Sequence, residues 1–188
     1  GTTMRASIAR SRTRDLPNVS VLAEQFNDFM LNKKFDVVTL IGVLEYSNVY
    51  VNSKNPIETV LSKVKGFLKP NGKLIIAIEN QLGLKYFTGA PEDHLGIPMF
   101  GIEDRYTDSS AVTFGRQHLS KLLSNAGMPN QCWWYPFPDY KVPNVLASHE
   151  ALVNPQINAQ LNSVITPAFD RDPQMPYTPT FSIDRVWR

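Results

Sequence analysis

Cysteine is nearly absent from this chain: Cys132 is the single example among 188 residues. A lone cysteine excludes an internal disulfide and any metal site built from several thiolates. A reducing, cytoplasmic environment fits this composition. No apolar run approaches the ~20 residues that a membrane-spanning helix requires, so we expect no membrane span. The formal net charge is only +2, which gives no field that would attract nucleic acid.

Glycine-rich turns and paired metal-ligand motifs are also missing. No two of the 10 glycines are separated by a single residue, so the G-x-G turn of nucleotide-binding loops is absent. The 3 histidines show no H-x-x-x-H spacing, and we therefore expect no metal site. Seven of the 14 prolines lie between residues 138 and 179, which predicts short elements in that region.

The hydrophobic pattern predicts alternating helices and strands. We expect helices at residues 4–15, 56–68 and 117–125, and strands at residues 18–25, 35–43, 73–79 and 131–137. The unbroken apolar run within 35–43 is typical of a strand that is covered on both faces. Pro70-Asn71-Gly72 is expected to end the second helix and turn the chain. We expect one or two short helices within residues 148–165. For residues 181–188 we expect a helix, and a strand is the alternative.

Strand 35–43, helix 56–68 and strand 73–79 make a βαβ unit, which packs right-handed onto a parallel sheet. The predicted fold class is therefore α/β with a mostly parallel sheet. We expect residues 1–137 to contain this sheet and residues 138–188 to form a proline-rich extension packed on the same domain. The irregular segment 81–114 is long for a connection, and such loops are usually functional or disordered.

The order of these motifs resembles class I S-adenosylmethionine (SAM) dependent methyltransferases. The matching segments are NVSV at 18–21, FDVVTLIGVLEY at 35–46, FLKPNGKLIIA at 67–77 and LSKLLSNAGM at 119–128. The resemblance covers roughly residues 5–137. It implies a Rossmann-like sheet, SAM as cofactor, and a small-molecule or saccharide-linked methyl acceptor. The segment YPFPDYKVP at 135–143 resembles modules of bacterial surface-sugar biosynthesis proteins, some of them fused to glycosyltransferases.

The family binds SAM through a glycine-rich loop after its first strand and an acidic residue after its second. Neither is present, so the resemblance implies that the first two strands are missing and that this chain alone binds SAM poorly. One alternative is a non-catalytic docking module of a glycosyltransferase-containing protein, which could self-associate through the sheet edge at 19–25. A nicotinamide-dependent enzyme is a weaker alternative, because the G-x-G-x-x-G motif is absent.

Four residues occupy positions where the resemblance implies cofactor contacts. Gln25 and Phe26 stand where the family places an adenine-contacting pair. Gly42 and Leu44 follow the central strand, at the edge where open α/β sheets bind ligands, and a glycine there permits close approach. The alternative reading makes Gln25 a polar residue at a strand end and Phe26 a core aromatic.

The candidate catalytic residues are Glu45, Tyr46 and His94. Glu45 and Tyr46 follow the central strand, and the family often has histidine where Tyr46 stands. His94 is preceded by two carboxylates, which would raise its proton affinity and orient it as a general base. A solvated polar loop is the competing explanation for His94.

Further polar residues after the second buried strand are candidates for binding the methyl acceptor. They lie at the strand end or in the long loop, where ligand-binding groups are common. The set is Asn80, Glu92, Asp93, Arg105 and Tyr106. For the aromatic pair Trp133 and Trp134, alternation along a strand predicts that one packs in the core.

Overall fold

The computed structural model describes residues 2–26, 28–87, 89–137, 140–141, 143–157 and 160. The expected final element at 181–188 therefore lies outside the described residues. Within this part of the chain two compact units are separated, Gly1–Lys33 and Lys34–Arg188.

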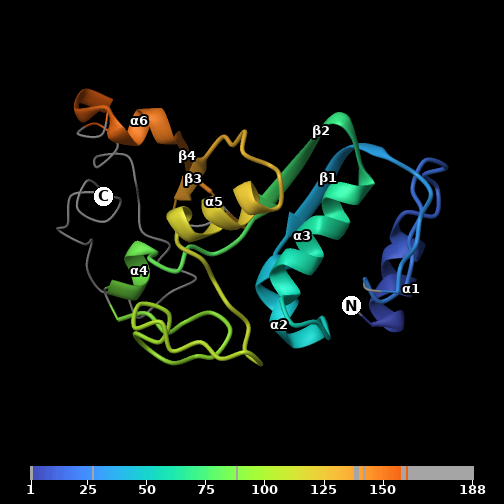
Figure 1. Ribbon diagram of the computed structural model, residues 1–188, viewed down its shortest axis with the longest axis horizontal. Helices are drawn as coiled ribbons and strands as arrows, with labels where there is room; N and C mark the ends of the chain where they lie inside the picture. The colour runs from blue at the N-terminus through green and yellow to red at the C-terminus, as the bar shows by residue number, and fades with distance from the viewer. Residues whose placement is uncertain are drawn as a thin grey trace. The chain divides into compact units, whose positions relative to one another are not determined.

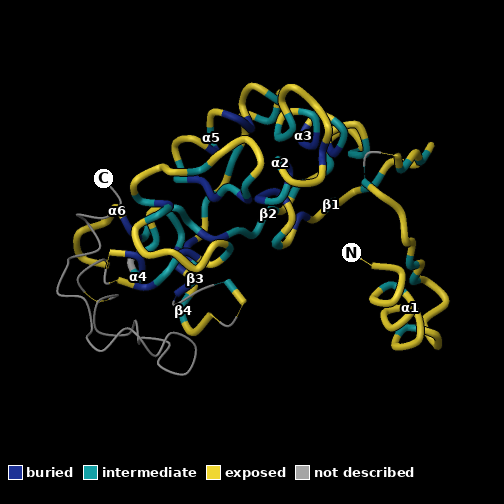
Figure 2. The backbone as a smooth tube through the Cα atoms, turned by 90° about the horizontal axis from the view of Figure 1, so that it is seen from below, coloured by how far each residue is buried: buried dark blue, intermediate teal, exposed yellow. Residues whose placement is uncertain are grey.

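The first unit contains one helix, α1 (Thr3–Arg12), which confirms the predicted basic helix. The Thr2 side chain accepts a hydrogen bond from the Arg5 backbone N–H and so caps the first turn. None of the α1 residues is buried (Figure 2). The predicted strand at residues 18–25 is wrong, because that segment has no regular structure. Backbone bonds from Val19 to Leu16 and from Phe29 to Gln25 form local turns instead.

The second unit is built around the predicted βαβ unit. Strand β1 (Phe35–Ile41) leads through η1 (Leu44–Tyr46) and α2 (Ser47–Tyr50) to helix α3 (Pro56–Phe67) and strand β2 (Leu68–Ala77). The strands β1 and β2 pair in parallel, with Val38 opposite Leu74 and Ile41 opposite Ala77. Helix α3 packs along the pair (Figure 1). The parallel arrangement inferred from the sequence is thus confirmed.

Helix α3 forms where the apolar residues recur at three- and four-residue steps. Pro56 occupies the first turn, where its missing N–H costs no intrahelical bond. Val60, Leu61 and Val64 are the buried residues of the helix. Burying each such side chain contributes about 1.5–3 kcal/mol, so this stripe holds the crossover onto the strands.

The turn expected at Pro70-Asn71-Gly72 is an irregularity inside β2 rather than a separate connection. Phe35 of β1 pairs with Leu68 of β2, and the next pair is Val37 with Lys73. Between these two pairs β2 therefore contains more residues than β1, which makes a bulge. Asn71 adopts φ 65, a left-handed conformation that asparagine tolerates better than most residues. Helix α3 nevertheless ends at Phe67, close to the predicted position.

The expectation that the central strand is covered on both faces is wrong. Leu40 is buried, whereas Val37 is 49% and Ile41 is 50% exposed. On β2, Ile75 is likewise 50% exposed, while its neighbours Leu74 and Ile76 are partly covered. Burial alternates along the strands because α3 covers one face only.

The rest of the second unit is a long loop followed by short elements. Residues 81–114 contain the helix α4 (Leu84–Phe87) and otherwise turns, as expected for an irregular segment. Helix α5 (Arg116–Asn125) confirms the predicted helix and buries Leu119, Leu122 and Leu123. Gly127, with φ 75, follows its end in the conformation typical of helix termination.

The predicted strand near residue 134 forms, but it pairs in a separate antiparallel sheet. Strand β3 (Trp134–Phe137) pairs with β4 (Val145–Ser148), so the pairing crosses the expected boundary between residues 137 and 138. Helix α6 (His149–Val153) follows directly, as predicted from the helical pattern of that region. Trp133 packs against the small core around β3, while Trp134 is exposed.

These elements define a mixed α/β protein. The described strands form one parallel pair and one antiparallel pair, and they do not join into a single sheet. Among the residues described, no helix is both long enough and apolar enough to cross a membrane.

Candidate functional site

Parallel pairing brings the residues that follow β1 and β2 to one edge of the sheet. Gly42 directly follows β1, adopts φ 61 and donates its N–H to the Ala77 carbonyl at 2.9 Å. The next turn, η1, carries Glu45, which is only 2% exposed. Glu79 lies two residues beyond β2 and is 7% exposed. Two carboxylates are therefore buried at the same strand edge.

The loop after β2 adds a histidine whose position is set by a third buried carboxylate. Glu92 Oε2 accepts the backbone N–H groups of His94 and Leu95, each at 2.8 Å. Glu92 Oε1 lies 2.8 Å from His94 Nδ1. Glu92 thus fixes both the local backbone and the orientation of the imidazole ring.

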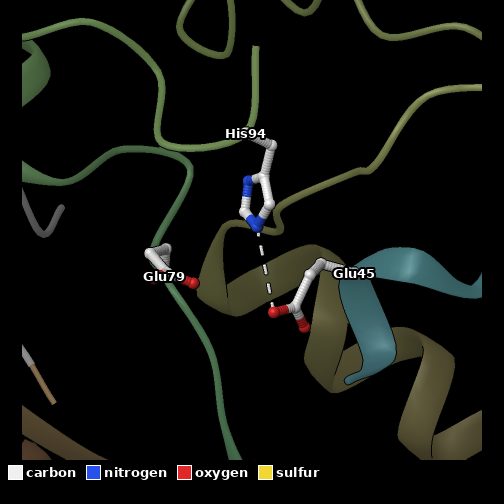
Figure 3. A group of neighbouring side chains, drawn as sticks. All are labelled: Glu45, Glu79 and His94. Atoms are coloured by element: carbon white, nitrogen blue, oxygen red, sulfur yellow. Dashed lines mark ion pairs between the residues drawn. The ribbon is translucent and has the colours of Figure 1, made fainter. Parts of the chain in front are cut away.

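His94 points its other ring nitrogen toward the carboxylates at the strand ends (Figure 3). The distance from His94 Nε2 to Glu45 Oε1 is 3.9 Å. The Tyr46 ring meets the imidazole edge to face, with centroids 5.2 Å apart. Three possible metal-ligand atoms lie within 4.8 Å of one another. They are a carboxylate oxygen of Glu45, a carboxylate oxygen of Glu79 and a ring nitrogen of His94, so these three residues could hold a metal ion.

The charges of this cluster are only partly compensated. Lys141 donates a hydrogen bond to Glu79 Oε1. Burial alone would lower the pKa of Lys141, but the hydrogen bond to Glu79 raises this pKa above its usual value. The second oxygens, Glu45 Oε2 and Glu79 Oε2, are buried and have no hydrogen-bond partner within the described part of the chain. A buried carboxylate oxygen without a donor is costly and calls for an explanation.

The protonation of His94 bears on its chemical role. The neighbouring carboxylates of Glu45 and Glu92 raise the pKa of His94 to about 10, against the opposing effect of burial. At neutral pH the imidazole then carries a proton and cannot accept another. Among the candidate catalytic residues this favours Glu45 over His94 as the general base, because Glu45 Oε2 has no hydrogen-bond donor among the described residues.

Two candidate acceptor-binding residues hold the loop instead of facing His94. Asp93 bonds to Lys85 at 3.0 Å and to the Tyr86 hydroxyl. Burial would raise the pKa of Asp93, but the bonds from Lys85 and Tyr86 lower it. Asn80 Oδ1 accepts the Leu82 backbone N–H at 3.1 Å and so closes a turn after β2.

The structure places the remaining candidates of this unit away from the cluster's polar contacts. Arg105 pairs with Glu103 at 3.0 Å and lies over the Phe100 ring. The Tyr106 hydroxyl is hydrogen-bonded to Thr113. Leu44 is 1% exposed and packs in the core. These residues shape the loop and the turn that carry the cluster.

Gln25 and Phe26 belong to the first unit. Gln25 is exposed, Phe26 is half-buried, and neither follows a strand. The Gln25 carbonyl accepts the backbone N–H groups of Asp28 and Phe29. The strand end at which an adenine contact was expected is therefore not formed.

Glu79 and Lys141 were not among the residues predicted for the site. Glu79 is the last residue of the strand predicted at 73–79, and this position at the sheet edge was a usable signal. Lys141 lies 62 residues further along the chain, and no local pattern connects it with Glu79.

Comparison with known proteins adds no relative: the chain matches no family model and no curated protein. The structure thus defines a mixed α/β protein with a buried Glu–His–Glu cluster beside a parallel βαβ unit.

Proposed function

We propose that this chain contributes the later half of a Rossmann-like SAM-dependent methyltransferase domain acting on a small-molecule or saccharide-linked acceptor. The observation that carries the proposal is the convergence of Gly42, Glu45 and Glu79 at the carboxyl ends of β1 and β2. Open α/β sheets bind their ligands at this edge. The sequence resemblance supplies the particular reaction.

The residues present fit one part of such a cofactor site. At Gly42 the left-handed backbone, φ 61, is one that side-chain-bearing residues rarely adopt. A Cβ atom there would lie 3.0 Å from the Tyr140 hydroxyl and 3.5 Å from Glu45 Oε1. Gly42 thus lets Tyr140 and Glu45 approach the strand edge closely, and the proposal assigns the glycine-rich contacts to residues that are not part of this sequence.

When bound, SAM would supply an electrophilic methyl group, whose bond to the sulfonium sulfur breaks as the acceptor oxygen bonds to its carbon and a neutral thioether leaves. The role proposed for Glu45 is to accept the proton of an acceptor hydroxyl as that oxygen forms its bond to carbon. Its Oε2 has no hydrogen-bond donor among the described residues, but the atom is buried, so the acceptor has to displace the groups that cover it. The imidazolium of His94, held by Glu92, orients the Glu45 carboxylate and balances its charge.

The test compares the complete gene product with this 188-residue chain, using SAM that carries a radiolabelled methyl group. We expect the complete product to bind SAM and to transfer label to sugar-linked acceptors, and the chain alone to bind SAM much more weakly. Glu45→Gln should lower the transfer rate by about 10²–10⁴-fold, the range of general-base contributions. Glu103→Gln, at an exposed pair with Arg105, is the matched control. A complete product that binds no SAM would overturn the proposal.

A second candidate, a docking module without catalysis, is favoured by one observation. Val37, Ile41 and Ile75 leave apolar surface on the uncovered face of the strands. Among the described strands β1 pairs with β2 alone, which leaves its other edge for a further strand. Light scattering that shows a monomer at all concentrations would argue against self-association through this edge.

A further inference from the structure

The buried carboxylates at the strand ends lack the donors that a purely structural network would supply. Glu45 Oε2 and Glu79 Oε2 are both shielded from water and both lack a hydrogen-bond partner among the described residues. A protein gains nothing in stability from such atoms, since buried polar groups are normally paired. Each belongs to a side chain that is more than nine-tenths buried.

The geometry points to a binding site for a divalent metal cation formed by Glu45, Glu79 and His94. Their donor atoms lie within 4.8 Å of one another and face a common point (Figure 3). Metal–oxygen and metal–nitrogen bonds of about 2.0–2.2 Å place donors up to about 4.4 Å apart around one ion. The approach required to close the site is therefore small.

The surroundings of His94 match those of a metal-binding histidine. Such histidines usually give one ring N–H to a carboxylate, which fixes the ring and leaves the other nitrogen for the metal. Here Nδ1 is paired with Glu92 at 2.8 Å, and Nε2 faces Glu45. Glu92 is itself held by two backbone N–H groups, so the ligand is oriented before any ion arrives.

Two carboxylates and one imidazole suit Mn²⁺, which accepts both kinds of ligand, and the lack of a thiolate disfavours soft metals such as Cu⁺. Lys141 occupies Glu79 Oε1 and leaves Oε2 for the ion. Binding of the metal displaces the Nε2 proton of His94, and without a metal that proton and the ammonium of Lys141 supply the positive charge. The competing explanation is that the His94 imidazolium and the Lys141 ammonium alone balance the charge of the carboxylates, and that no metal binds.

The proposal is tested with Mn²⁺ alone, by electron paramagnetic resonance on the purified protein after treatment with a chelator. We expect one bound Mn²⁺ per chain, seen as loss of the free-ion signal. Glu45→Gln and Glu79→Gln should each weaken binding at least tenfold, and Glu92→Gln by about 10–100-fold, as for other residues that orient ligands. Glu103→Gln should leave the affinity unchanged.

A second readout identifies the histidine directly. Pulsed measurements on bound Mn²⁺ should show coupling to one imidazole nitrogen, and His94→Gln should remove it. His118→Gln, on helix α5, should leave the coupling in place. Near-ultraviolet circular dichroism verifies that each variant is folded.

Failure is unambiguous because the unmodified protein is measured first. If it leaves the free Mn²⁺ signal unchanged at millimolar metal, the site does not exist. If Mn²⁺ binds but Glu79→Gln and His94→Gln have no effect, the ion lies elsewhere and the assignment is wrong. Neither result depends on SAM, so the proposed methyl transfer can fail independently.

Discussion

The two parallel strands and the residues that follow them show opposite patterns of burial. Along the strands, Val37 and Ile75 leave about half of their apolar surface exposed. Glu45 and Glu79 at the strand ends and Glu92 in the long loop are almost completely buried. Hydrophobic burial would favour the reverse distribution, because burying a charge is costly unless it is paired.

The comparison teaches that different forces shape the two regions. Helix α3 and the covered face of the strands supply stability through apolar contacts. At the strand ends, keeping carboxylates away from water lowers the stability of the fold. Such a cost is typical of ligand-binding and catalytic sites. Substitutions in the two regions should therefore differ in kind as well as in size.

The largest effect is expected in the covered part of the βαβ unit. Leu61 on α3 is fully buried, so Leu61→Ala removes packing and leaves a cavity. We expect the free energy of unfolding to fall by about 2–5 kcal/mol, measured by urea denaturation. Ile75→Ala, on the exposed face, should cost about 1 kcal/mol or less. An equal loss for both variants would show that the strand face is covered in solution and would break the comparison.

The next effect concerns the buried charges. Glu92→Gln replaces an acceptor of backbone N–H groups with an amide that cannot accept at both positions. The unpaired donors should lower the free energy of unfolding by about 1–3 kcal/mol. Hydrogen exchange at the His94 and Leu95 amides should accelerate as well. If Glu103→Gln, at an exposed position, lowered the free energy of unfolding by the same amount, the buried hydrogen bonds of Glu92 would not contribute specifically to stability.

A smaller effect is expected where the two regions meet. Gly42→Ala forces a side chain into a left-handed conformation at φ 61, at a cost of about 1–2 kcal/mol. Gly66→Ala on α3 is the matched control, because a Cβ atom there meets nothing within 4 Å. The control should stabilise the protein by about 0.5–1 kcal/mol. Thermal unfolding measures whether each variant is less or more stable than the original protein. A stabilising effect of Gly42→Ala would contradict the left-handed conformation at this residue.

The smallest effect lies at the opposite end of β1, where charge is exposed. The hydrogen bond from Lys69, at 2.8 Å, lowers the pKa of Asp36 below its ordinary value of 3.8. Because the folded pKa is the lower one, the contribution to stability is present above 3.8 and is lost as the pH falls through the folded value. Carboxyl chemical shifts followed by nuclear magnetic resonance measure this pKa. Lys69→Gln should return it toward 3.8, and no change would show that the pair is not formed.

Local patterns were enough to predict the βαβ unit but not the distribution of burial along it. The spacing of Val60, Leu61 and Val64 predicted α3, and the apolar runs predicted β1 and β2. The segment 18–25 also contains β-branched residues, yet it forms no strand because a strand requires a partner to pair with. The same run of apolar residues in β1 suggested two covered faces, although one helix covers only one.

The candidate site was predicted in its parts. Glu45, Glu92 and His94 were recognised as chemically capable residues near strand ends or in a long loop. Glu79 was passed over in favour of Asn80, and Lys141 gave no local signal. Arg105 and Tyr106 were expected to bind an acceptor but make their contacts within the loop.

By itself the sequence determined the helices α1, α3 and α5 and the strands β1 and β2, because apolar periodicity acts over a few neighbouring residues. It also determined that β1 and β2 run parallel, since a helical crossover joins them. Only the tertiary structure decided that Glu45, Glu79 and His94 share one water-free space. That decision depends on the pairing of β1 with β2, which joins residues far apart in the chain and is not encoded within any single segment.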